Sequence, residues 1–83
     1  MFYGELRAGQ PVRGVLEQPD GFLAGEVAQG VVQATDEPEV TLRAFREAEK
    51  AARAASNQFK AANNHASAQF YARKARRLAE QMD

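Results

Sequence analysis

The chain contains no cysteine, no tryptophan and a single histidine among its 83 residues. Without cysteine there is no disulfide framework and no thiolate nucleophile, so the composition gives no indication of an oxidising compartment. His65 has no partner at a metal-ligand spacing, and the sequence holds neither an HExxH motif nor a serine in a nucleophile elbow. We therefore expect no catalytic residue, no metal and no cofactor, which means that the protein is not an enzyme.

Long apolar runs are also missing. No stretch of about 18 apolar residues occurs, and the N-terminus lacks the apolar segment and cleavage site of a secretory signal. We therefore expect a soluble, cytoplasmic protein with no membrane partner and no small-molecule substrate. A chain of 83 residues suits one small domain (1–83), whose core is marginal in size, so association with a protein partner or with a second copy is expected.

Glycine and proline are confined almost entirely to the first third of the chain. All six glycines and two of the three prolines lie in residues 1–30, where apolar residues alternate with other types. This composition predicts a small antiparallel β-meander of three or four strands over residues 1–35. The glycines have neither P-loop nor GxGxxG spacing and do not lead directly into a helix, so they indicate turns rather than a phosphate-binding loop.

The stretch QPDG at 18–21 predicts a tight turn between two of these strands. If Gln18 pairs with Gly21, all cross-strand pairs are chemically compatible, and such pairs specify the register. The predicted pairs are Leu16–Leu23, Gly14–Gly25, Val12–Val27 and Arg13–Glu26. A glycine bulge at Gly21 would shift this register by one residue, and we prefer the unshifted pairing.

The second half of the chain has helical composition. From Val40 to Asp83 there is neither glycine nor proline, and alanine is abundant. The preceding Asp-Glu-Pro-Glu stretch at 36–39 predicts a helix start, with Asp36 as the capping residue and proline in the first turn.

Two apolar seams with alternating spacings of three and four residues run along this helical part. The first consists of Phe45, Ala48, Ala52, Ala55 and Phe59, and the second of Ala68, Tyr71, Ala75, Leu78 and Met82. The seams are out of phase across Asn63-Asn64-His65, so one straight helix could not bury both. If the chain folds back there, large residues of one seam meet small residues of the other.

We therefore predict an α+β fold in which an Ala-rich antiparallel helical hairpin over residues 36–83, with its turn near 63–65, follows the β-meander. Asparagine suits both a left-handed helix stop and the N-cap of a following helix. The alternative is one long C-terminal helix, about 60 Å in length at 1.5 Å per residue.

The hairpin region also carries a resemblance to known families. Its residues Ser56, Phe59, Asn63, Asn64, His65, Ala68, Tyr71, Lys74, Ala75 and Leu78 resemble one tetratricopeptide-type helical hairpin, and are similar to microtubule-interacting-and-transport hairpins. The likeness covers about one repeat unit, without the tryptophan and Gly-Tyr markers of the first helix and without a second copy. It implies hairpin geometry and a role in protein interaction.

The net charge of zero conceals a division of charge. Residues 1–39 contain two basic and seven acidic residues, a net −5, while the remainder contains nine basic and four acidic residues, a net +5. No carboxylate occurs between Lys50 and Glu80. The nine cations are therefore the candidate contacts for an anion or an acidic partner: Arg43, Arg46, Lys50, Arg53, Lys60, Arg73, Lys74, Arg76 and Arg77.

These observations favour a non-catalytic protein-interaction or assembly protein that self-associates or forms a small subunit of a larger complex. A small nucleic-acid-binding protein that uses the basic helices is the alternative, although no groove-reading motif is present. A third hypothesis is a small regulator or inhibitor of an enzyme. The cations could also serve only to solvate the exposed helical faces and to complement the helix dipoles.

Overall fold

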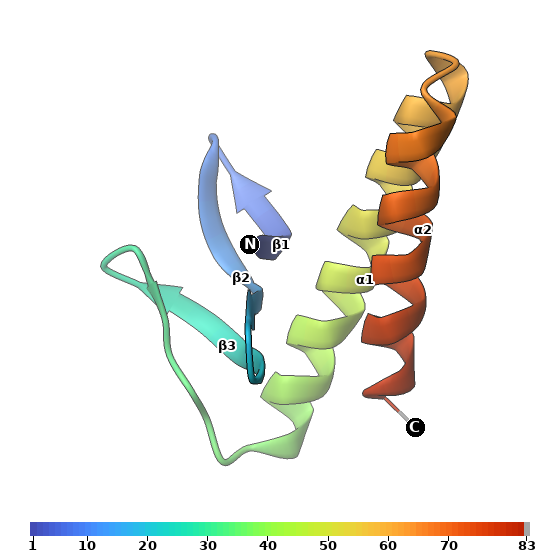
Figure 1. The fold of residues 1–83 in the computed structure, drawn as a ribbon. Helices are drawn as coiled ribbons and strands as arrows, with labels where there is room; N and C mark the ends of the chain where they lie inside the picture. Colours follow the sequence, from blue (N-terminus) through green and yellow to red (C-terminus); the bar gives the residue numbers. More distant parts are fainter. Residues whose placement is uncertain (83) are drawn as a thin grey trace.

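The computed structural model describes residues 1–82 and has four strands followed by two helices (Figure 1). The elements are β1 (Phe2–Arg7), β2 (Gln10–Gln18), β3 (Gly21–Ala28), β4 (Val31–Val32), α1 (Pro38–Ala61) and α2 (His65–Glu80). The strands form an antiparallel meander in the order β1-β2-β3-β4. The predicted α+β class is therefore confirmed, and the alternative of one long C-terminal helix is wrong. Asp83, the last residue of the predicted helical part, lies outside the described residues.

The register of the central hairpin is the unshifted one. Gln18 pairs with Gly21, and the ladder continues through Leu16–Leu23 and Gly14–Gly25 to Arg13–Glu26. The observed ladder ends there, so the predicted Val12–Val27 pair does not form; on the other edge of β3, Val27 pairs with Val32 of β4. On the other side of β2, a bulge between Glu5 and Leu6 interrupts its pairing with β1.

One face of the sheet packs against the helical hairpin. Tyr3, Val15 and Ala24 form one row across three strands, and Tyr3 and Val15 are buried. They join a core with Phe45, Ala48 and Ala52 of α1 and with Ala75 and Leu78 of α2. Phe22, partly buried, adds an edge-to-face contact with Phe45 at 6.0 Å between ring centroids. This burial of apolar surface is the main favourable term that holds the sheet to the hairpin.

The opposite face of the sheet depends on glycines where the backbone or a ring approaches closely. Gly4 and Gly14 pair with each other, and a Cβ atom on either would meet the Phe2 ring within 3.0 Å. A Cβ atom on Gly25 would collide with the carbonyl oxygen of Gln33, because the chain leaving β4 passes directly over β3 at this point. Glycine at 25 is therefore required by space rather than by a special φ angle.

The turn between the helices uses both asparagines. Asn63 adopts a left-handed conformation with φ of 61°. The backbone N–H of Asn64 donates to the Phe59 carbonyl at 2.8 Å, and that of Asn63 donates to the Lys60 carbonyl at 3.1 Å. These two bonds form a Schellman motif, which ends α1. The Asn64 side chain then caps α2 by accepting from the Ser67 N–H at 3.2 Å.

The start of α1 differs from the prediction. The N-cap is Glu37 rather than Asp36, and no side chain caps the helix. Pro38 occupies the first helical position, where its missing N–H removes one of the donors that a cap would satisfy. Asp36 lies one residue too early to cap, and the Thr35 hydroxyl accepts from the Glu37 N–H at 3.1 Å instead.

The two predicted seams lie between the helices and toward the sheet. Phe45, Ala48, Ala52, Ala68, Ala75 and Leu78 are buried, whereas Ala55, Phe59, Tyr71 and Met82 are half-buried. Near the turn the Phe59 and Tyr71 rings stack at 5.5 Å with nearly parallel planes. Ala52 and Ala75 are almost completely inaccessible to solvent, as is expected where small residues let two helices approach closely.

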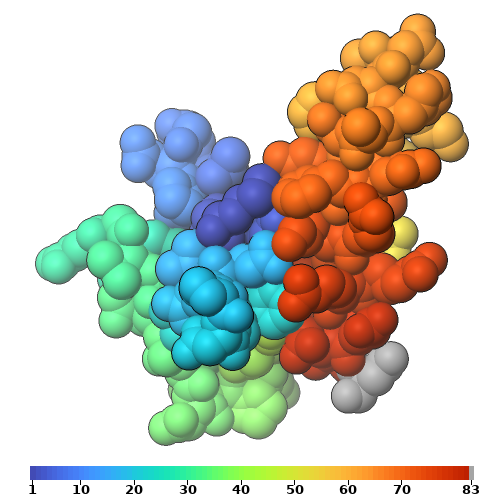
Figure 2. Space-filling model, viewed as in Figure 1, coloured from blue at the N-terminus to red at the C-terminus, as the bar shows by residue number. Residues whose placement is uncertain are grey.

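The hairpin sets the length of the molecule and extends beyond the sheet. The 24 residues of α1 span about 36 Å, close to the longest dimension of 39 Å. Figures 1 and 2 show the turn end of the hairpin, in orange, projecting past the strands. Within residues 1–82, neither helix has both the length and the apolar character needed to cross a membrane.

Candidate interaction surface

The nine predicted cations are divided among three settings. Lys74 and Arg77 of α2 bind Glu17 of the sheet, and Arg53 of α1 binds Glu49 one turn earlier. The other six make no ion pair within residues 1–82 and are exposed: Arg43, Arg46, Lys50, Lys60, Arg73 and Arg76. The structure therefore does not bring all nine together into one site.

The contact around Glu17 joins the acidic and basic halves of the chain. Lys74 Nζ donates to both carboxylate oxygens of Glu17 at 2.9 Å, and Arg77 Nη1 donates to Oε2 at 3.3 Å. The Glu17 and Lys74 side chains are only 16% and 20% exposed, so this pair is screened less than a surface pair. Lys74 and Arg77 therefore contribute to the attachment of α2 to the sheet, while the Arg77 side chain remains 58% exposed.

Two pKa values are shifted at this contact. The hydrogen bond from Lys74 is the main reason that the pKa of Glu17 is lowered. Burial, followed by the charge of Glu17 and a hydrogen bond of 3.4 Å to it, raises the pKa of Tyr3 to about 12. Both shifts favour the arrangement seen here, in which an ionised carboxylate accepts from an ammonium group and from a protonated phenol.

A row of cations follows the exposed side of α1. Arg43, Arg46, Lys50 and Arg53 lie at i, i+3, i+7 and i+10, which places them along one side of the helix, and all four are exposed. The row is about 15 Å long at the helical rise. We call these four residues the α1 row. Among the described residues, Arg53 is the one member of the row that forms an ion pair, with Arg53 Nη2 and Glu49 Oε2 2.8 Å apart.

A groove runs between the helices near the turn, and none of its lining residues comes from the sheet. It consists of two adjoining hollows of about 270 and 120 Å³, which share Ser56 and Ala72. The Ser56 hydroxyl donates to the Ala68 carbonyl at 2.8 Å and so links the two helices at the floor. We call this feature the hairpin groove; its lining residues are Arg53, Ser56, Asn57, Lys60, His65, Ala68, Gln69 and Ala72.

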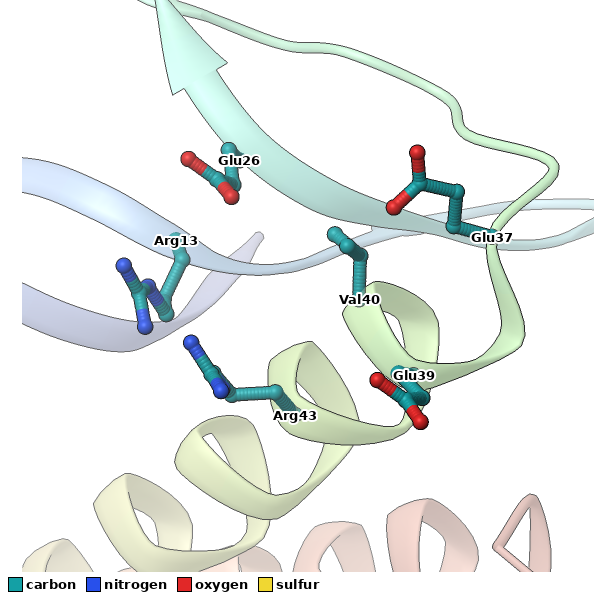
Figure 3. A pocket seen from close by; sticks show the side chains of 6 residues that line it. All are labelled: Arg13, Glu26, Glu37, Glu39, Val40 and Arg43. Atoms are coloured by element: carbon teal, nitrogen blue, oxygen red, sulfur yellow. The ribbon is translucent and has the colours of Figure 1, made fainter.

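A third hollow lies between the sheet and the first turns of α1 (Figure 3). The Arg13 and Arg43 side chains extend toward each other there, beside a set of carboxylates from the sheet and from the start of α1. The carboxylates are Glu26, Glu37 and Glu39. The hollow holds about 80 Å³, and its lining has three carboxylates against two guanidinium groups, so neither its size nor its charge favours an anionic ligand.

His65 is the first residue of α2, is exposed, and lines the hairpin groove. Within residues 1–82, no group of three or more histidine and carboxylate side chains is placed to hold a metal ion.

The chain has no significant match among protein-family models, curated proteins or solved structures.

Sequence reasoning found the cations but not their different settings. Glu17 received no role, although it binds two of the nine. The sequence also offers Asn57 and Gln69 as hydrogen-bonding groups near the cations, but it does not predict the groove that they line. A signal for it was present, because Ala68 belongs to the second predicted seam and Ser56, Gln69 and Ala72 are each next in sequence to a seam residue.

Proposed function

We propose that the protein is a non-catalytic interaction or assembly protein that binds an acidic protein surface, on another protein or on a second copy, through its helical hairpin. The observation that supports the proposal most directly is the free positive charge of the hairpin. The turn end of the hairpin projects past the sheet (Figure 2). Between Lys50 and Glu80 the hairpin sequence contains cations but no carboxylate. The resemblance to single helical hairpins of interaction domains points the same way.

The geometry also indicates which cations take part. Lys74 and Arg77 share the single carboxylate of Glu17, so one of their two positive charges is balanced within the molecule. The exposed cations of α1, together with Arg73 and Arg76 of α2, remain accessible. A partner with carboxylates at matching positions would be attracted to this side, and the attraction would fall as salt rises.

Light scattering at low and high salt tests the proposal. We expect a species larger than a monomer at low salt, either an oligomer or a complex with a co-purified acidic protein, and its dissociation at high salt. The matched variants are Lys60→Gln, which should weaken association, and Arg7→Gln, which removes the same charge from a 74% exposed side chain of the sheet and should not. A protein that stays monomeric and without a partner at low salt contradicts the proposal.

Nucleic-acid binding is the second candidate, supported by the regular spacing of the α1 row. Four cations along about 15 Å of helix could contact successive phosphates. With two tyrosines and no tryptophan the protein absorbs weakly at 280 nm, so co-purified nucleic acid would be evident in the absorbance spectrum. Replacing Arg43, Arg46 and Lys50 with glutamine should then abolish binding; unchanged binding would exclude this mechanism.

A further inference from the structure

We infer that the hairpin groove is the docking site for an acidic protein segment with small side chains. The inference rests on the proposed function and adds the place where the partner binds and the chemistry by which it is recognised. Three observations carry it: the shape of the groove, the charge of its rim and the kinds of side chain in its lining.

The shape of the groove suits a chain that approaches closely. Its floor is made by Ala68, Ala72 and Ser56, which have small side chains, and the hydroxyl of Ser56 is already bonded to the Ala68 carbonyl. A partner backbone can therefore come near both helices without displacing a large side chain. Large side chains on the partner would hold it away from this floor, so we expect alanine, glycine or serine at the contact.

The rim of the groove is cationic and offers unpaired polar groups. Arg53 and Lys60 contribute positive charge, and none of the described residues that line the two hollows is a carboxylate. Within residues 1–82, the Lys60, Asn57 and Gln69 side chains make no hydrogen bond to the protein. The ammonium group of Lys60 can bind a carboxylate, and the two amides can each donate to and accept from a peptide backbone.

The lining favours a protein over a nucleic acid. No aromatic ring lines either described hollow, so a base has no surface on which to stack. Phe59 stacks on Tyr71, and Phe70 packs edge-on against Tyr71 with the Lys74 ammonium group 5.2 Å from its ring centre.

A short peptide of glutamate and alanine is the probe, titrated into the full chain at low salt while backbone amide signals are followed by NMR. We expect the largest shifts at Ser56, Gln69 and Ala72, and weaker binding at high salt. A lysine and alanine peptide of the same length, which has the opposite charge, should not bind. A single-stranded oligonucleotide should bind more weakly than the acidic peptide.

Two matched substitutions separate the groove from general attraction of charge. Ala72→Leu fills the floor without changing charge, and because Ala72 is exposed the variant should fold. We expect it to lower the affinity about tenfold, which corresponds to about 1.4 kcal/mol. Ala54→Leu is the control, since Ala54 is an exposed alanine of α1 that does not line the groove. The Ala54→Leu variant should bind the acidic peptide with the same affinity as the unaltered protein.

Three results would overturn the inference. If Ala72→Leu binds normally while Lys60→Gln weakens binding, the peptide docks elsewhere on the hairpin, and the proposed function stands without the groove. If the oligonucleotide binds more tightly and shifts the same amides, the groove is a nucleic-acid site. If the acidic peptide does not bind at low salt, the groove is not its docking site, and light scattering still decides the proposed function independently.

Discussion

Lys74 on α2 and Glu17 on β2 are 57 residues apart in the sequence and are joined by two hydrogen bonds of 2.9 Å. The same carboxylate also binds Arg77, whose guanidinium group lies 5.5 Å from the centre of the Phe22 ring. One negative charge of the acidic half of the chain is therefore paired with cations of the basic half within the molecule. This contact also provides the first of five predictions.

Glu17→Gln should lower the free energy of unfolding by about 1 to 2 kcal/mol, because it removes a charged acceptor from the largely buried Lys74 ammonium group. Urea denaturation measures the change. Glu49→Gln is the matched control: its partner Arg53 is 61% exposed, so the loss should stay below about 0.5 kcal/mol. The lowered pKa of Glu17 adds stability that is present above pH 4.5 and lost as the pH falls below it. Glu17→Gln should therefore make the free energy of unfolding less sensitive to acid. If the two variants lost equal free energy of unfolding, this account would be refuted.

Tyr3 should make the protein sensitive to alkaline pH. Its pKa is about 12 in the folded protein, against 10.0 for an ordinary tyrosine. Above pH 10 the unfolded chain releases this proton first, so the free energy of unfolding should fall as the pH rises from 10 toward 12. Denaturation at a series of pH values measures the slope. Tyr3→Phe should flatten it, and an undiminished slope in that variant would assign the effect to other groups.

Asn63 should be replaceable by glycine but not by alanine. Its φ of 61° lies in the left-handed region, where a Cβ atom without a compensating polar group costs about 1 kcal/mol. Asn63→Ala should therefore reduce the melting temperature, whereas Asn63→Gly should leave it nearly unchanged or raise it. Thermal unfolding followed by circular dichroism compares the two. The hairpin turn would need a different explanation if alanine were tolerated as well as glycine.

Gly25→Ala should destabilise the sheet by about 2 kcal/mol or more, because the added methyl group collides with the Gln33 carbonyl. Gly9→Ala is a useful comparison. Gly9 has φ of 78° and nothing within 4 Å of its Cβ position, so its substitution should cost only about 1 kcal/mol through backbone strain. Chemical denaturation measures the free energy of unfolding of both variants. If Gly9→Ala were the more destabilising of the two, the close passage of the chain over β3 would be in doubt.

Glu49→Gln should strengthen binding of the acidic peptide to the hairpin groove. The Glu49 carboxylate lies 2.8 Å from Arg53 and competes with a partner carboxylate for it. An exposed pair of this kind is worth up to about 1 kcal/mol, so we expect a gain of about two- to fivefold in affinity, measured by titration calorimetry. Glu47→Gln makes the same change of charge on α1 without releasing Arg53. If it raised the affinity equally, the gain would come from net charge alone.

The sequence by itself determined which elements form and in what order. Glycine and proline before residue 31, their absence after Val40, and the Pro-Asp-Gly turn specify strands, helices and the register, because these preferences act between near neighbours. The phase break at Asn63 and Asn64 similarly predicted the hairpin.

Only the tertiary structure decided how the charged residues are used. Whether Lys74 binds Glu17 or stays free depends on how α2 lies against β2, which no local pattern encodes. The same holds for the sheet face that Tyr3 and Val15 bury, and for the hollow beside Ser56 and Ala72. A local sequence pattern predicts a helix or strand because the preferences that form it act within a few residues. These contacts instead depend on how elements from distant parts of the chain pack together.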